Sequence, residues 1–247
     1  MTDPVALAFA AAAACTAAFL GLGFFLPGAQ WFGKTLQHGD RSSKKISLTF
    51  DDGPNEPYTS HLLDLLSETG VPAAFFVVGL HARKHPSVVR RMAADGHIIG
   101  NHTYSHSSIA PLGNSSSEIM LTDKAIEEIT GIRPVFLRPP YGHKTPWFLL
   151  SSRKTGHITV MWSLEVNDWS ASIGREITNR VLRRIKGGDV ILLHDGDGIH
   201  DGADRKPTID ATRSMIEELR KLGFTFVSLN ELLAVPGKTS QQGHVTV

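Results

Sequence analysis

Short apolar runs alternate with amphipathic stretches from Ile46 onward, and this alternation gives the first indication of the fold. Apolar runs bounded by turn residues are typical of buried strands, whereas apolar positions spaced three and four apart indicate helices. Seven runs are expected to form strands: Ile46–Phe50, Ala73–Val78, His97–Gly100, Val135–Arg138, Ile158–Trp162, Val190–His194 and Thr225–Ser228.

Between the expected strands lie helical patterns that end at glycines such as Gly70, Gly96 and Gly131. Ser115 and Glu118 stand in capping-box spacing at the start of one of these helices. Strands that alternate with helices imply a parallel sheet, which is either an open doubly wound sheet or a barrel. No glycine-rich phosphate-binding fingerprint follows the first expected strand, which weakens a nucleotide-binding interpretation.

The N-terminal segment has a different pattern, because Val5 to Leu26 contains no charge and is apolar on all sides. A helix of this length spans roughly 33 Å, close to the thickness of a hydrocarbon core. The residues before it lack the positive region of a signal peptide, so an uncleaved membrane anchor through residues 5–26 is favoured over a cleaved signal. A buried helix of a soluble fold is the alternative. The expected organisation is an anchor over 1–27, a linker over 28–43, one domain over 44–235 and a polar tail over 236–247.

Composition excludes some kinds of partner and site. The formal net charge of +1 offers no electrostatic case for a nucleic-acid partner. The single cysteine, Cys15, excludes an intramolecular disulfide and a thiolate zinc cluster. Any bound metal must therefore use histidine and carboxylate ligands. Nothing in the sequence predicts a protein partner.

Chemically active side chains recur at the positions where the expected strands end. In a parallel barrel the carboxyl ends of the strands and the loops after them share one face, where active sites form. The side chains expected on this face are Asp51, Asp52, His102, His106, Arg138, Glu165, Asp168 and His194.

His102 and His106 are four residues apart, a spacing that places two imidazoles on one side of a helical turn. One carboxylate added to this pair gives a three-ligand metal site with open positions for water and substrate. Asp51 and Asp52 are adjacent and point in different directions, so one can bind a metal while the other handles a proton. An Asp-Gly turn with a helix cap would explain one of these aspartates but not both.

Five short motifs stand in a fixed order: Thr49-Phe50-Asp51-Asp52-Gly53-Pro54, His102-Thr103-Tyr104-Ser105-His106, Arg138-Pro139-Pro140-Tyr141-Gly142, Asp168-Trp169 and Leu192-Leu193-His194-Asp195-Gly196. Over roughly Lys45 to Leu229, this set resembles the polysaccharide deacetylases of the NodB-homology type, carbohydrate esterase family 4. The resemblance implies an α/β fold, a distorted (β/α) barrel of seven to eight parallel strands, preceded here by the N-terminal hydrophobic helix.

The resemblance also implies roles for these residues. Asp52, His102 and His106 would hold one divalent metal ion, for which zinc is expected and cobalt and nickel are alternatives. Asp51 would be the general base, held ionised and oriented by Arg138.

The other motifs would supply the acid and the substrate contacts. His194 would be the general acid, paired with Asp168. The backbone N–H of Tyr141 would help to stabilise the oxyanion, and Trp169, Tyr141 and Pro139 would contact the sugar. Where family members often carry aspartate, this chain has Glu165, to which no catalytic role is assigned.

The expected activity is hydrolysis of N-acetyl groups from peptidoglycan, a chitin-like oligomer or another amino-sugar glycan, with a metal-bound water attacking the acetamide. A glycosidase that uses Asp51 and Asp168 is one alternative, although it leaves the histidines unexplained. A non-catalytic, membrane-tethered glycan-binding protein of the same fold is another. The substrate predicts an extracytoplasmic domain in the cell envelope. The basic residues after the anchor argue the other way by the positive-inside rule, because they have no counterpart before it; they are Lys34, Arg41, Lys44 and Lys45.

Overall fold

The structure, a computed structural model, describes residues 4–25, 29–108, 113 and 115–235. It contains two short 3₁₀ turns, η2 (Pro140–Gly142) and η3 (Asp168–Ser170). The strands are β1 (Lys45–Asp51), β2 (Ala73–Val77), β3 (Ile98–Asn101), β4 (Phe136–Leu137), β5 (Ile158–Thr159), β6 (Leu164–Glu165), β7 (Val190–His194) and β8 (Thr225–Phe226). The helices are α1 (Pro4–Phe25), α2 (Tyr58–Thr69), α3 (Gly79–Lys84), α4 (Pro86–Ala94), α5 (Ser115–Thr130), α6 (Pro146–Lys154), α7 (Gly174–Leu182), α8 (Lys206–Lys221) and α9 (Leu229–Leu232).

The strands pair in parallel along the path β5-β4-β3-β2-β1-β7-β6, and β8 pairs with β1 off this path. The register brings the carboxyl ends of the central strands together. Asp51 at the end of β1 lies opposite His194 of β7 on one side and Phe76 of β2 on the other. Asn101 at the end of β3 lies opposite Val77 and opposite Leu137. Residues that follow these strands therefore meet at one end of the sheet.

Among the described residues, β5 and β6 form the two ends of the strand path and do not pair with each other, so the sheet is a half-barrel. Arg138 lies at this opening, where it donates hydrogen bonds to the carbonyls of Val160 and Met161 between the two strands. The barrel expected from the sequence is thus correct in strand direction, but it is open between β5 and β6. Residues that precede β1 lie there, since Leu36 forms an isolated bridge with Val160 and His38 forms one with Asp189.

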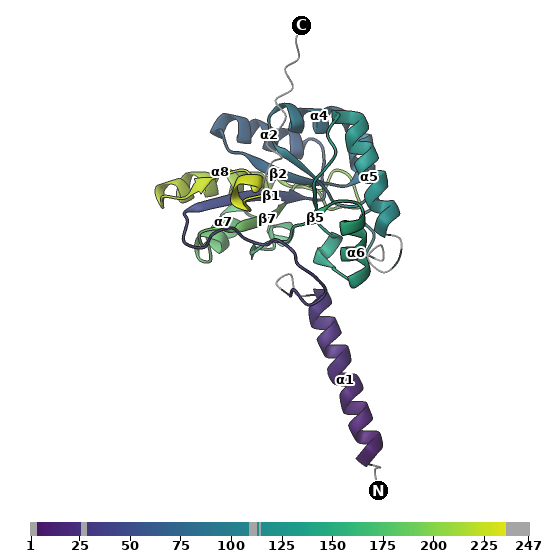
Figure 1. Ribbon diagram of the computed structural model, residues 1–247. Coiled ribbons are helices and arrows are strands. Elements are labelled where there is room, and N and C mark those ends of the chain that lie inside the picture. The colour runs from purple at the N-terminus through teal and green to yellow at the C-terminus, as the bar shows by residue number, and fades with distance from the viewer. Residues whose placement is uncertain (1–3, 26–28, 109–112, 114, 236–247) are drawn as a thin grey trace.

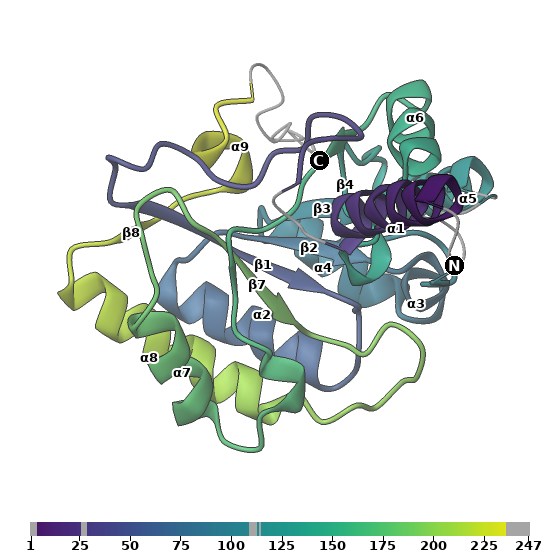
Figure 2. The ribbon, with the colours of Figure 1, turned by 90° about the horizontal axis from the view of Figure 1, so that it is seen from below.

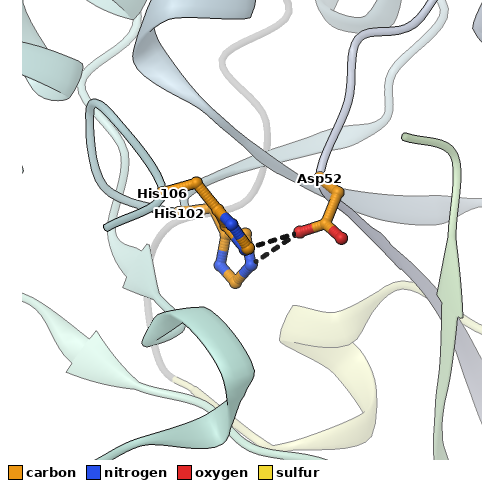
Figure 3. A group of neighbouring side chains, drawn as sticks. All are labelled: Asp52, His102 and His106. Atoms are coloured by element: carbon orange, nitrogen blue, oxygen red, sulfur yellow. Dashed lines mark ion pairs between the residues drawn. The ribbon is translucent and has the colours of Figure 1, made fainter. Parts of the chain in front are cut away.

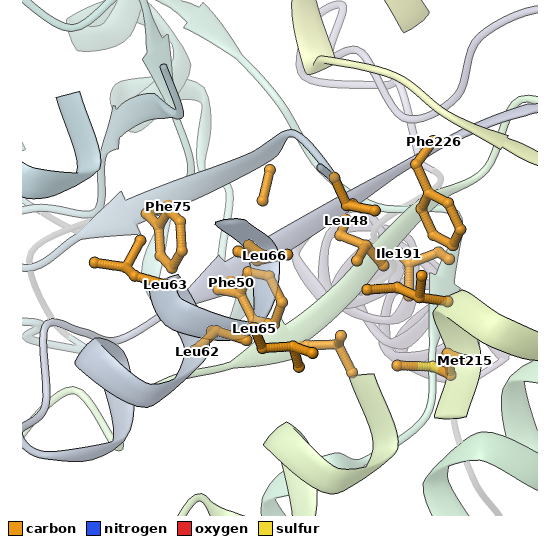
Figure 4. Close-up of a cluster of buried hydrophobic side chains, with 14 of the residues drawn as sticks. Leu48, Phe50, Leu62, Leu63, Leu65, Leu66, Phe75, Ile191, Met215 and Phe226 are labelled. Atoms are coloured by element: carbon orange, nitrogen blue, oxygen red, sulfur yellow. The ribbon is translucent and has the colours of Figure 1, made fainter. Parts of the chain in front are cut away.

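Side chains alternate along β1, so that its apolar residues face outward and its polar residues face the inside of the half-barrel. Ile46, Leu48 and Phe50 of β1 join a core that the leucines of α2 and residues of α4, α7 and α8 cover from outside (Figures 2 and 4). Thr49 and Asp51 alternate with them and are equally buried, but they point to the opposite face. Packing on the outer face holds the strands, so the inner face can carry charged groups.

Helix α1 forms over the N-terminal run and extends away from the half-barrel, with Leu7 and Phe9 exposed (Figure 1). Within the described part of the chain, no helix combines the length and apolar character needed to cross a membrane. The structure therefore does not support the predicted membrane span. The predicted polar tail, residues 236–247, lies outside the described residues.

Candidate active site

Three side chains converge at the carboxyl end of the sheet as the sequence predicts for a metal site. The Nε2 atoms of His102 and His106 lie 3.2 and 2.9 Å from Oδ1 of Asp52 (Figure 3). All three ligand atoms lie within 4.8 Å of one another, and all three residues are buried. Two ligand atoms of one tetrahedral zinc ion are separated by about 3.4 Å. The residues present therefore fit a divalent ion that prefers nitrogen and oxygen ligands.

The two histidine rings are fixed in different ways. Nδ1 of His102 lies 2.9 Å from the carbonyl oxygen of Arg138, and this contact turns Nε2 toward Asp52. Among the described residues, Nδ1 of His106 is buried without a hydrogen-bond partner. Gly198 packs against that ring, because a Cβ atom at position 198 would lie 2.4 Å from Nδ1 of His106, and its φ of +78° also disfavours a side chain.

The charges of the site favour a cation. Burial would raise the pKa of Asp52, but its hydrogen bonds to His102 and His106 hold that pKa well below its ordinary value. Burial lowers the pKa of His102, yet the carboxylates of Asp51 and Asp52 outweigh this effect and raise it. A buried pair of carboxylates beside two imidazoles is an environment that stabilises positive charge.

Strained backbone surrounds these ligands. Asp52, Thr103, His106 and Tyr141 have φ values of 78°, 66°, 53° and 57°, in the left-handed region that residues other than glycine rarely adopt. Each such residue costs roughly 1–3 kcal/mol and persists only where its surroundings fix it. The loops at this end of the sheet therefore hold functional side chains in positions that relaxed loops would not give.

Asp51 forms a buried ion pair with Arg138 on the inner face of the sheet. Nη1 of Arg138 donates to Oδ1 of Asp51 at 2.6 Å and to Oγ1 of Thr49 at 3.0 Å. The Arg138 side chain is fully buried, and its guanidinium lies 4.0 Å from the centre of the Phe76 ring. Burial lowers the pKa of Arg138, although the charge of Asp51 opposes that change. This network holds the Asp51 carboxylate in one orientation.

His194 lies on the other side of Asp51 and is held by Asp168. Nδ1 of His194 is 2.7 Å from Oδ1 of Asp168, while Oδ2 of Asp168 accepts from the His194 backbone N–H and from Oγ1 of Thr208, both at 2.9 Å. Burial lowers the pKa of His194, but the Asp168 carboxylate outweighs it and raises the pKa to about 9. This shift favours the imidazolium form of His194 at neutral pH, the form that can donate a proton.

The pKa of His194 predicts how activity and stability depend on pH. Because the folded pKa exceeds the ordinary 6.5, the stability that this pair contributes is complete below pH 6.5 and is lost as the pH rises through about 9. In Asp168→Asn, the alkaline limb of the pH–rate profile is expected to move at least about one pH unit to lower pH. Profiles of acetate release measure this shift. Asp210→Asn, an exposed change on α8, is the control, and an unmoved limb in Asp168→Asn would contradict the assignment.

Glu165 contacts a tryptophan instead of the acid. Its Oε2 accepts from Nε1 of Trp162 at 3.1 Å, and the Trp162 ring lies 5.7 Å from the Arg138 guanidinium carbon. Asp168 has partners for both of its carboxylate oxygens inside the protein. That arrangement argues against Asp168 as a glycosidase carboxylate.

The predicted substrate contacts differ in exposure. Tyr141 and Trp169 are 49% and 57% exposed, and the Tyr141 ring lies 4.7 Å from the ring of His106. Pro139 is buried, so little of its surface is accessible for the predicted contact with the sugar. The exposed face of Tyr141 beside His106 can pack against a sugar ring.

The sequence interpretation missed residues that act behind the motifs. Thr208 and Gly198 contact Asp168 and His106, and Thr49 of the first motif, which received no role, contacts Arg138. A threonine or a glycine alone carries no signal of such a role. The only available signal was the alternation in β1, which places Thr49 on the same face as Asp51.

A half-barrel with this set of side chains at its carboxyl end defines a class of hydrolases, and comparison with known proteins gives the family. The family model for polysaccharide deacetylase matches residues 38–160. A peptidoglycan-N-acetylglucosamine deacetylase of Bacillus cereus is 36% identical over 198 residues, which cover 78% of this chain and 89% of that protein. A chitooligosaccharide deacetylase of Sinorhizobium fredii is 35% identical over 204 residues, which cover 79% and 95%.

Solved structures agree with this assignment. A peptidoglycan N-acetylglucosamine deacetylase of known crystal structure is 33% identical in sequence to this chain. The two structures match with a TM-score of 0.76 over 81% of this chain and 92% of that one. A pseudoenzyme of carbohydrate esterase family 4 from Bacillus anthracis is 22% identical to this chain. Its structure has a TM-score of 0.72 over 81% of this chain and 68% of its own, and at this identity the likeness shows only the fold. The chain belongs to the polysaccharide deacetylase family and is a deacetylase hydrolase.

Proposed function

We propose that this protein removes N-acetyl groups from an amino-sugar polymer, either peptidoglycan or a chitin-like oligomer, and releases acetate. The observation that carries the proposal is the convergence of Asp52, His102 and His106 beside Asp51 and His194 at one end of the sheet. The names of the two curated relatives support the substrate class.

Asp52, His102 and His106 would hold one divalent ion, for which zinc is the expected choice. Cobalt and nickel are accepted by the same nitrogen and oxygen donors. Bound there, the ion would polarise the acetamide carbonyl and lower the pKa of a water molecule.

The remaining residues move protons and orient the substrate. Asp51 would take a proton from the attacking water, because Arg138 fixes its Oδ1 and leaves Oδ2 on the side of His102, 3.7 Å from Nε2. A C–O bond forms, the C–N bond breaks, and His194 would give its proton to the departing nitrogen, so that acetate and an amine result. The Tyr141 N–H would donate to the oxyanion, and Trp169 would wall the sugar pocket.

Removal of the metal ligands tests the proposal. Acetate release from peptidoglycan fragments and chitooligosaccharides is expected to be lost with a chelator and restored by added zinc. The double variant His102→Ala/His106→Ala is expected to lose at least about 10²-fold, because it removes two of three ligands. His61→Ala changes an exposed histidine on α2 and is the matched control.

Each alternative has its own outcome in this assay. Undiminished acetate release by the double variant would contradict the metal site. New reducing ends without acetate would support a glycosidase, and chito-oligomer binding without acetate release would support a non-catalytic module. The location of the domain outside the cytoplasm stays a prediction, which protease accessibility in intact cells would test.

A further inference from the structure

His102 and His106 lie in one loop, residues 102–106, which is here called the metal loop. Its backbone is held on one side by β2 and α3. The N–H of His102 donates to the carbonyl of Val77 at 3.0 Å. The N–H groups of Gly79 and Leu80 donate to the carbonyls of Thr103 and Tyr104, both at 3.0 Å. These contacts are all between backbone atoms.

On its other side the metal loop is held by two side chains. Oδ1 of Asn101 accepts from the N–H of Thr103 at 2.8 Å. Oε2 of Glu118, in the first turn of α5, accepts from the N–H of Tyr104 at 3.0 Å, the N–H of Ser105 at 2.8 Å and Oγ of Ser105 at 3.0 Å. One carboxylate oxygen thus collects three donors from the segment between the two histidines. The capping-box spacing of Glu118 did not predict this contact.

Helix α5 also supports the beginning of the metal loop. Nδ2 of Asn101 donates to Oδ1 of Asp123 at 2.8 Å and to the carbonyl of Ile119 at 2.9 Å. Asp123 is buried, and Nε2 of His157 lies 3.0 Å from the same oxygen. Helix α5 therefore supports the metal loop at two points: it binds Asn101 at the start of the loop, and its own Glu118 binds the middle of the loop.

His106 depends on this support more than His102 does. The His102 ring has a contact of its own at Nδ1, whereas among the described residues Nδ1 of His106 has none. The position of the His106 ring therefore depends on its packing against Gly198 and on its backbone, which is left-handed at Thr103 and at His106 itself. A loop in this conformation relaxes unless its N–H groups stay bound.

We propose that Glu118 is a positioning residue for the metal: by binding the N–H groups of Tyr104 and Ser105 it keeps His106 where it can act as the third ligand. The inference rests on the proposed function, since it assumes the metal site. Partners that orient metal ligands typically change metal affinity about 10- to 100-fold when they are lost.

Zinc affinity of the full chain, measured by competition with a chromophoric chelator, tests this role. Glu118→Ala is expected to bind zinc about 10- to 100-fold more weakly than the wild type. Glu118→Gln keeps a carbonyl acceptor without the charge, so we expect an intermediate loss of about 3- to 10-fold. Glu127→Ala changes an exposed glutamate of the same helix and is expected to leave the affinity unchanged.

Unfolding of the metal-free proteins separates positioning from folding. Glu118→Gln is expected to unfold close to the wild-type temperature while binding zinc more weakly, which a purely structural role would not produce. Zinc affinity within twofold of wild type in Glu118→Ala would overturn the inference. If that variant does not fold, the same result in Glu118→Gln would overturn it. Failure of the wild type to bind zinc, cobalt or nickel would instead contradict the proposed function.

Discussion

Acetate release by Asp51→Asn is expected to fall about 10²- to 10⁴-fold, the usual contribution of a positioned general base. Asparagine has nearly the same shape, and its Oδ1 can still accept from Nη1 of Arg138, which lies 2.6 Å from the aspartate oxygen. The variant therefore loses the proton acceptor while most of the geometry stays. The measurement is kcat/KM on a chitooligosaccharide at saturating zinc.

Zinc affinity and thermal unfolding of Asp51→Asn show whether the lost activity comes from chemistry. Both are expected to change far less than kcat/KM, because Asp51 is not one of the three proposed ligands. Asp64→Asn on α2 is the matched control, since that aspartate is exposed and pairs with Arg91. Activity of Asp51→Asn within tenfold of wild type would remove Asp51 from the role of base.

Arg138→Met is expected to destabilise the protein by about 3–5 kcal/mol, because it leaves the buried carboxylate of Asp51 without its cation. Methionine fills much of the space but cannot donate to Oγ1 of Thr49 or to the carbonyls of Val160 and Met161. These acceptors at the opening of the half-barrel lose their partners as well. Urea unfolding in the presence of a chelator measures the change.

A surface arginine and a double variant complete this experiment. Arg83→Met breaks a half-exposed ion pair with Glu128 and is expected to cost less than about 1 kcal/mol. Adding Asp51→Asn to Arg138→Met is expected to recover part of the loss, because the unpaired charge is removed. If Arg138→Met unfolds at the same urea concentration as Arg83→Met, the buried pair does not stabilise the half-barrel.

The sequence predicted that the site residues would meet on one face, because parallel strands place their carboxyl ends there. Asp51, Asn101 and His194 end β1, β3 and β7, and strand pairing alone brings these ends together. The expected central strands match the observed ones to within a residue or two, because long buried apolar runs show a clear pattern in the sequence. The family resemblance supplied roles for the motif residues, and these roles remain to be tested by the variants above.

Short elements escaped the sequence interpretation. Strand β6 has two residues, and helix α3 has six, too few for either periodicity to show. Yet α3 supplies the N–H groups that hold the metal loop, through Gly79 and Leu80. The predicted membrane span was not supported either, since no helix among the described residues is both long enough and apolar enough to cross a membrane.

By itself the sequence determined the parallel α/β architecture and the strand ends that carry chemistry, because these depend on local periodicity and on residue type. It also indicated a pair of histidines with one carboxylate as a candidate metal site, and the family resemblance then pointed to Asp52 as that carboxylate. Tertiary structure alone decided that Glu165 contacts Trp162, that the barrel stays open between β5 and β6, and that Glu118 holds the metal loop. The second and third outcomes depend on contacts between residues distant in the chain. Many side chains could make such contacts, and only packing in three dimensions selects the ones that do.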